Sequence, residues 1–108
     1  MQKSLLIAAV LLAAAVTSAS AAEAKENWEK SCAKCHGLDG KGETKIGKKL
    51  EIKDFTDAKY QATLKDADML KAIKDGIKDG DKTKMKAAED LNEAEMKALV
   101  AFVRALKK

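Results

Sequence analysis

One short segment of the chain holds the residue types that bind metals and react as nucleophiles. It reads Cys32-Ala33-Lys34-Cys35-His36, and it contains both cysteines and the only histidine of the 108 residues. Two thiols at this spacing can each add to one vinyl group of a porphyrin, and the histidine directly after the second thiol can ligate the porphyrin iron. This C-x-x-C-H motif therefore predicts one covalently attached haem c. Cys32 and Cys35 would be its tethers, and His36 would be an axial ligand.

Other uses of a C-x-x-C pair fit this chain less well. A zinc site takes four protein ligands, and the two cysteines and one histidine offer only three candidates. A thioredoxin-type redox pair accompanies a βαβ pattern, which the sequence lacks. An ordinary disulfide in an exported protein remains an alternative, and covalent haem on a denaturing gel would exclude it.

The N-terminus has the three regions of a secretory signal peptide. A positive start is followed by an unbroken apolar run of 12 residues, 5–16, and then by small residues up to Ala22. Such a run is too short to cross the bilayer, because about 30 Å of hydrocarbon requires roughly 20 apolar residues. We therefore expect residues 1–22 to be cleaved, with no transmembrane anchor. Residues 23–108 would form a periplasmic domain, because haem c is attached outside the bacterial cytoplasm.

The composition is that of one small soluble domain. Hydrophobic residues make up 46% and charged residues 35% of the sequence, a balance that excludes a disordered chain. The formal charge of +4 is spread along the chain and not gathered in a basic arm, so nucleic acid is not an expected partner. A mature chain of about 86 residues buries little surface on folding, and a bound cofactor is expected to help stabilise it.

Helical periodicity without strand alternation predicts an all-α fold around the motif. We expect helices over about 23–35, 66–75 and 93–106, with Gly76 ending the second and Asn92 capping the third. The segment 77–88 reads as a polar loop. Met69 and Met96 follow helix starts at the position of a hydrophobic staple, whereas Met85, in the polar loop, has no such structural role.

Nearly the whole mature chain resembles the class I cytochromes c of the bacterial mono-haem type. The residues that carry this resemblance are Trp28, the C-x-x-C-H motif, Gly37, Gly40, Gly42, Gly47, Leu50, Met85 and the closing helix around Phe102. The resemblance implies three to five short helices wrapped around one haem, with Trp28 near Phe102 where the first and last helices cross. It also implies that Met85 is the second axial ligand of the iron. The apolar residues expected to line the haem are Leu38, Ile46, Leu50, Phe55, Leu70, Ile73, Ile77, Leu91 and Leu99.

Two lysines stand where the family usually has proline. Lys48 replaces the proline whose carbonyl orients the ligand histidine, although the Lys48 carbonyl could still accept a hydrogen bond from His36. Lys86 replaces a proline that often follows the ligand methionine. The absence of this proline predicts a less rigid loop around Met85 and a weaker iron–sulfur bond.

The resemblance implies a monomeric carrier of single electrons that is not an enzyme. A histidine and a methionine fill both axial positions and favour the reduced iron. The partners would be redox proteins. The lysines near the motif and near Met85 could form a basic collar, which would favour partners with acidic docking patches. Alternatively, these lysines are simply part of a solvated surface. These lysines are Lys34, Lys41, Lys45, Lys48, Lys49, Lys82, Lys84 and Lys86. The alternative function is a gas sensor or weak peroxidase with a labile sixth ligand.

Overall fold

The computed structural model describes the backbone of residues 12–108 and the side chains of residues 21–108. Its elements, in chain order, are α1 (Leu12–Ser31), α2 (Ala33–His36), α3 (Lys45–Lys49), α4 (Ala58–Thr63), α5 (Asp66–Asp75), β1 (Ile77–Asp79), β2 (Lys82–Met85) and α6 (Glu93–Ala105). This mainly helical architecture confirms the all-α class. The described residues form six helices against the three to five expected, because Cys32 divides the first helix and two short helices, α3 and α4, lie in segments without clear periodicity.

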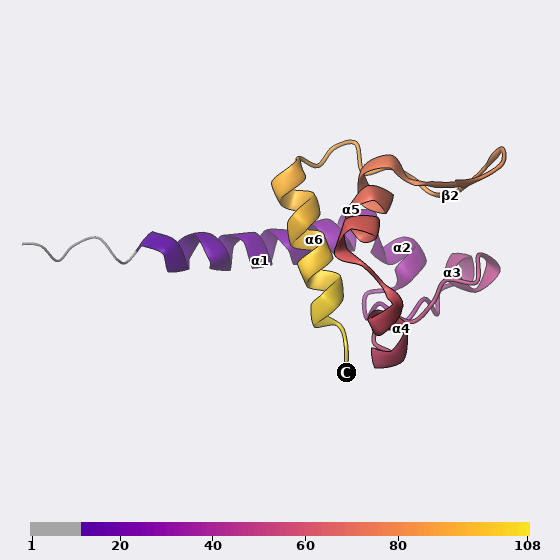
Figure 1. Cartoon of the computed structure of the whole chain (residues 1–108), viewed down its shortest axis with the longest axis horizontal. Coiled ribbons are helices and arrows are strands. Elements are labelled where there is room, and N and C mark those ends of the chain that lie inside the picture. Colours follow the sequence, from indigo (N-terminus) through magenta and orange to yellow (C-terminus); the bar gives the residue numbers. More distant parts are fainter. Residues whose placement is uncertain (1–11) are drawn as a thin grey trace, which may run out of the picture.

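Helix α1 runs from Leu12 to Ser31 and crosses α6 near its C-terminal part (Figure 1). It passes through Ala21 and Ala22, the predicted cleavage positions, without a break. The beginning of the predicted signal peptide, residues 1–11, lies outside the described residues. Within the described part of the chain, no helix combines the length and apolar character that a membrane span requires.

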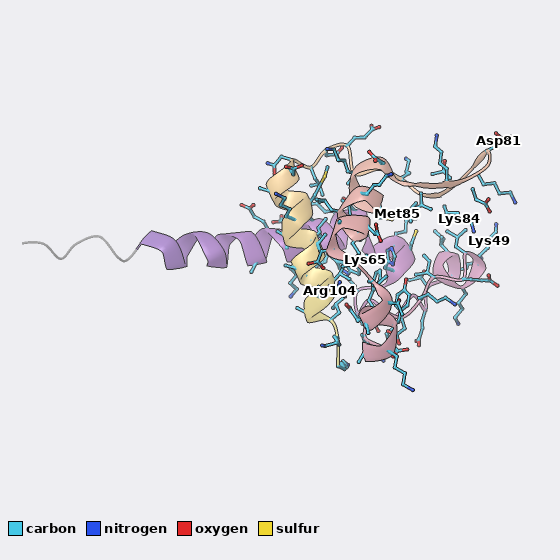
Figure 2. All side chains as sticks on the ribbon, viewed as in Figure 1. Lys49, Lys65, Asp81, Lys84, Met85 and Arg104 are labelled. Carbon is cyan, nitrogen blue, oxygen red and sulfur yellow. The ribbon has the colours of Figure 1, made fainter. Side chains whose placement is uncertain are left out.

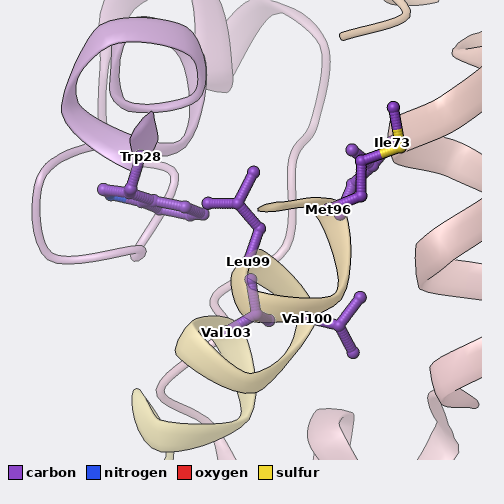
Figure 3. Packing of buried hydrophobic residues seen from close by; sticks show 6 residues of the cluster. All are labelled: Trp28, Ile73, Met96, Leu99, Val100 and Val103. Carbon is purple, nitrogen blue, oxygen red and sulfur yellow. The ribbon is translucent and has the colours of Figure 1, made fainter. Parts of the chain in front are cut away.

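The hydrophobic core lies where α1, α5 and α6 meet. Its buried cluster comprises Trp28, Ile73, Met96, Leu99, Val100 and Val103. Figure 3 shows Leu99 directed at the Trp28 ring and Met96 beside Ile73. The Trp28 and Phe102 rings lie 5.2 Å apart, so the expected packing of the first helix on the last is confirmed. Ala24 is also buried, and its small side chain permits the close approach of the two helices.

Local sequence signals fix the ends of α5 and α6. Helix α5 spans the predicted 66–75 and ends at Gly76, whose φ of 76° is a conformation that favours glycine. Helix α6 begins with the predicted capping box: the Asn92 side chain accepts from the Glu95 N–H, and the Glu95 carboxylate accepts from the Asn92 N–H.

The segment after Gly76 differs from the expected polar loop. It forms an antiparallel hairpin of β1 and β2, in which every strand residue except Met85 is exposed. The hairpin extends away from the helices (Figure 1). Alternation of hydrophobic and polar residues could not reveal these strands, because neither face of the hairpin is buried along its length.

Helix α4 is joined to α6 by a polar network. The buried Gln61 side chain donates to the carbonyls of Phe55 and Val103, at 2.7 and 2.8 Å. Arg104 donates to the carbonyls of Gln61 and Leu64, at 2.8 and 2.7 Å. These bonds satisfy backbone carbonyls at the α4–α5 corner, which has little apolar packing of its own.

Candidate functional site

The C-x-x-C-H motif lies at the junction of α1 and α2. The Cys32 N–H donates to the Trp28 carbonyl at 2.9 Å, and the His36 N–H donates to the Cys32 carbonyl at 3.0 Å. These bonds continue the helical path through the turn at Cys32. Both cysteines are free thiols and partly buried. The two thiols are therefore not joined to each other, and both can form bonds to a common partner.

Burial raises the pKa of the Cys32 thiol to about 11, and the neighbouring Cys35 adds to this shift. A thiol with such a pKa is protonated at neutral pH and is a poor nucleophile. The folded site therefore keeps Cys32 as a thiol and disfavours its reaction with electrophiles.

Aromatic rings surround the His36 imidazole. The Phe55 ring is stacked on it with 5.0 Å between centroids, and the Trp28 ring lies 5.6 Å away. Phe55 is in turn stacked on Tyr60. Burial among these rings lowers the pKa of His36. A neutral imidazole is the form that ligates a metal ion, so the surroundings of His36 suit an iron ligand.

The two nitrogens of His36 differ in their surroundings. Nδ1 is buried without a hydrogen-bond partner and is the only such side-chain atom in the part of the chain that the structure describes. The Lys48 carbonyl, expected as its acceptor, instead lies near the N–H groups of Leu50 and Glu51 at the end of α3. No hydrogen bond engages Nε2 among the described residues, so it is the nitrogen that would ligate an iron.

The glycine-rich loop after His36 is bonded back onto the motif. The Trp28 Nε1–H donates to the Gly37 carbonyl at 3.0 Å, and the Gly42 N–H donates to the His36 carbonyl at 2.7 Å. Gly47 is required for its size, because a Cβ there would come within 2.6 Å of the Cys35 carbonyl oxygen. The glycine-rich loop therefore fixes the backbone of the motif through hydrogen bonds and close backbone packing.

Thr44 completes this attachment, although no sequence motif marks it. Its hydroxyl donates to the Cys35 carbonyl at 2.6 Å and accepts from the Gly47 N–H at 2.8 Å. Thr44 is also the N-cap of α3. Threonine is a common N-cap residue, but nothing in the sequence pairs Thr44 with the second cysteine.

Met85 ends β2 and is the one strand residue of the hairpin that is partly buried. Met85 and Cys32 both pack against the core cluster. Figure 2 shows Met85 at the base of the hairpin, whereas Asp81 lies at its far tip. Met69 and Met96 also pack against or within the core, in agreement with their structural roles.

The apolar residues expected to line a haem fall into two groups. Ile73 and Leu99 are buried in the core cluster. Leu38 and Ile77 are exposed, at 70% and 44%, and are the large hydrophobic side chains most open to solvent among the described residues. Leu38 follows the motif and Ile77 pairs with Met85, so both exposed side chains flank predicted haem-binding residues.

A family model described as "Cytochrome C oxidase, cbb3-type, subunit III" matches residues 19–103, which include the motif and Met85. The chain belongs to this family of c-type cytochromes. Among solved structures, the KustC0563 c-type cytochrome is similar, with 33% identity and a TM-score of 0.67 over 79% of this chain and 98% of that chain. A tyrosine-to-phenylalanine mutant of it gives 32% identity and a TM-score of 0.65, over 79% of this chain and 99% of that chain. No curated protein matches the chain.

The residues of the site fit the haem c that a c-type cytochrome carries. Two unpaired thiols stand one helical turn apart, a neutral imidazole has its Nε2 unbonded, and a thioether reaches the same core. Cys32 and Cys35 would form the thioethers and His36 would ligate the iron. The bound haem supplies the reversible one-electron chemistry.

Proposed function

We propose that residues 23–108 form a periplasmic one-haem electron carrier with His36 and Met85 as the axial ligands. The family shows a haem-based electron carrier, and the site geometry supports the finer assignment. The observation that carries it is the His36 ring, which packs against both Phe55 and Trp28 and has its Nδ1 buried. A thioether opposite this histidine would raise the reduction potential and keep small molecules from the iron. The protein would then have no catalytic iron site of its own.

Export of the chain is part of the same proposal. The match to the solved cytochrome covers 79% of this chain and 98% of that chain, so about a fifth of this chain has no counterpart there. That excess is close to the length of residues 1–22, the predicted signal peptide. Mass spectrometry of the purified protein tests it: the expected mass is that of a chain starting at Ala22 or Glu23 plus one haem.

We further propose that the carrier docks on acidic surfaces of its redox partners as a monomer. The lysines of α3 and of the hairpin lie toward the end of the molecule opposite the start of α1, where Figure 2 shows Lys49 and Lys84. If this collar steers association, the rate of electron transfer to an acidic partner should fall steeply with ionic strength.

The first test is the visible spectrum of the exported protein, oxidised and reduced, with and without carbon monoxide. Sharp reduced bands, a sulfur-to-iron charge-transfer band in the oxidised protein and no shift with carbon monoxide are expected. Met85→Ala should lose the charge-transfer band, and Met69→Ala, which removes a half-buried methionine elsewhere, should keep it. A rapid carbon monoxide shift of the wild-type protein would instead indicate a labile sixth position and a sensor or peroxidase.

A further inference from the structure

The base of the hairpin holds Met85 at a defined place in an otherwise exposed segment. The residue pairs Lys78 with Thr83 and Asp79 with Lys82 follow a regular antiparallel register, but Ile77 faces Met85. In an unbroken ladder Lys84 would face Ile77. Lys84 is therefore the extra residue of a β-bulge, and bulges bend a strand and redirect the side chains next to them.

Gly76 brings the end of α5 against the backbone of Met85. Its φ of 76° and ψ of −178° belong to a region that is essentially restricted to glycine. A Cβ at this position would lie 2.5 Å from the Met85 carbonyl oxygen and 2.9 Å from the Ala87 nitrogen. Only a glycine therefore allows the two backbones to approach as closely as they do.

The chain beyond Met85 is fastened to the same helix. The Ala88 N–H donates to the carbonyl of Ile73, a buried core residue of α5, at 2.8 Å. Met85 thus lies between two fixed points, the pairing with Ile77 on one side and the bond from Ala88 to Ile73 on the other. These contacts restrain the segment although Lys86, and not proline, follows Met85.

We propose that Gly76 and Ile77 are positioning residues that set the direction and rigidity of Met85 as an iron ligand. This inference rests on the proposed ligation by Met85. The close approach at Gly76 fixes the Met85 backbone, and the cross-strand contact with Ile77 fixes the face of the strand from which the Met85 side chain projects. The hairpin base thereby supplies the restraint that a proline after the methionine would otherwise give.

Two matched pairs of variants of the exported haem-loaded protein test the proposal. Gly76→Ala places a Cβ against Met85, whereas Gly80→Ala, also at a positive φ, meets nothing within 4 Å. Ile77→Ala removes the side chain that faces Met85, whereas Thr83→Ala removes an exposed side chain elsewhere on the hairpin. The readouts are the sulfur-to-iron band of the oxidised protein and its titration with imidazole, which competes with the methionine for iron.

We expect Gly76→Ala to lose most of the sulfur-to-iron band and to bind imidazole more tightly than the wild-type protein. Ile77→Ala should show a smaller change in the same direction, and both controls should match the wild type. Ile77 is 44% exposed, so its truncation does not threaten folding and keeps the test valid if Gly76→Ala is unstable. Wild-type behaviour of Ile77→Ala, or of a folded Gly76→Ala, would overturn the proposal.

Met85→Ala separates this proposal from the assignment on which it rests. If the wild-type protein lacks the band and Met85→Ala binds imidazole no more tightly, the ligation itself is wrong. If Met85→Ala loses the band while Gly76→Ala and Ile77→Ala keep it, Met85 is the ligand and only its positioning by the hairpin base is wrong.

Discussion

Thr44 connects two parts of the site through a single hydroxyl. The hydroxyl donates to the Cys35 carbonyl and accepts from the Gly47 N–H, so it joins the second haem-attachment residue to the start of α3. Both partners are partly or fully buried. Because a buried polar group that loses its partner retains its full desolvation cost, this hydroxyl matters more than an exposed one.

Thr44→Val should therefore destabilise the haem-loaded protein. Valine keeps the volume but leaves the Cys35 carbonyl and the Gly47 N–H unpaired, and we expect a loss of about 1–3 kcal/mol in the free energy of unfolding. Thr44→Ser keeps the hydroxyl and should recover most of that loss. Denaturant unfolding monitored by the haem spectrum measures both variants. Equal stability of the valine and serine variants would show that the hydroxyl contributes little.

Asp54 gives the fold a dependence on pH. Its carboxylate accepts from the Thr56 hydroxyl at 2.6 Å and from the Thr56 N–H at 2.8 Å. These bonds, with smaller contributions from the charges of Lys41 and Lys108, lower the pKa of Asp54 below its ordinary value of 3.8. A group with a lowered pKa in the folded state stabilises the protein above its unfolded pKa, and this contribution is lost as the pH falls through the folded pKa.

Asp54→Asn should consequently lower the unfolding temperature at pH 7 but not at a pH well below 3.8. Because Asp54 is partly exposed, we expect a difference of only about 1–4 °C at neutral pH. Thermal unfolding of both proteins from pH 7 down to about pH 2.5 tests this expectation. Thr56→Val, which removes the stronger of the two bonds, should reduce the pH dependence of the wild type. A pH-independent difference between Asp54→Asn and the wild type would contradict this origin.

At the scale of elements, the sequence predicted the helices whose ends are marked and missed those whose ends are not. Gly76 and the Asn92–Glu95 box identified the limits of α5 and α6 to within a residue. Helix α4 escaped prediction because it is held by distant contacts, such as the bond from Gln61 to the Val103 carbonyl. The hairpin escaped prediction because neither of its faces is buried along its length. The motif itself identified the cysteines and His36. The bond from Thr44 to the Cys35 carbonyl and the close approach of Gly76 to Met85 each join residues nine apart, and no local pattern pairs them.

Arg104 is the residue of α6 that fixes the α4–α5 corner. Besides its bonds to the carbonyls of Gln61 and Leu64, its Nε–H donates to the Asp66 carboxylate at 2.8 Å. Asp66 is 71% exposed, so that ion pair is worth about 0–1 kcal/mol. Among the described residues the Leu64 carbonyl accepts from Arg104 alone, whereas the Gln61 carbonyl also accepts from the Leu64 N–H. The planar guanidinium reaches all these acceptors at once, which an ammonium group cannot do.

Arg104→Lys should therefore destabilise the protein more than Asp66→Asn does. We expect a loss of about 1–3 kcal/mol for the lysine variant and less than about 1 kcal/mol for the asparagine variant. Guanidinium unfolding is unsuitable because it screens charge, so urea unfolding should be used. Similar losses for both variants would mean that the ion pair, and not the carbonyl bonds, stabilises the corner.

At the scale of the whole molecule, apolar packing is confined to one side. The buried hydrophobic residues are Ala24, Trp28, Ile73, Met96, Leu99, Val100 and Val103, all from α1, α5 and α6. From Gly37 to Thr63 the buried residues of the described chain are glycines and Gln61, and this stretch is held by hydrogen bonds such as that from the Phe55 N–H to the Gly40 carbonyl. A small apolar core leaves this half of the domain dependent on the haem for hydrophobic contacts.

Removal of the haem tethers should therefore unfold the stretch from Gly37 to Thr63 first. In exported Cys32→Ser/Cys35→Ser protein we expect no cooperative thermal transition, since a domain of about 86 residues has only about 4–13 kcal/mol of stability to lose. Hydrogen exchange should show the amides of Gly42 and Phe55, protected in the haem-loaded protein, exchanging freely, while those of α6 retain partial protection. The α1–α6 contact around Trp28 depends on side chains alone, so it can persist as a residual core. A cooperative transition within a few degrees of the haem-loaded protein would mean that the seven buried hydrophobic residues suffice and that the haem binds a preformed fold.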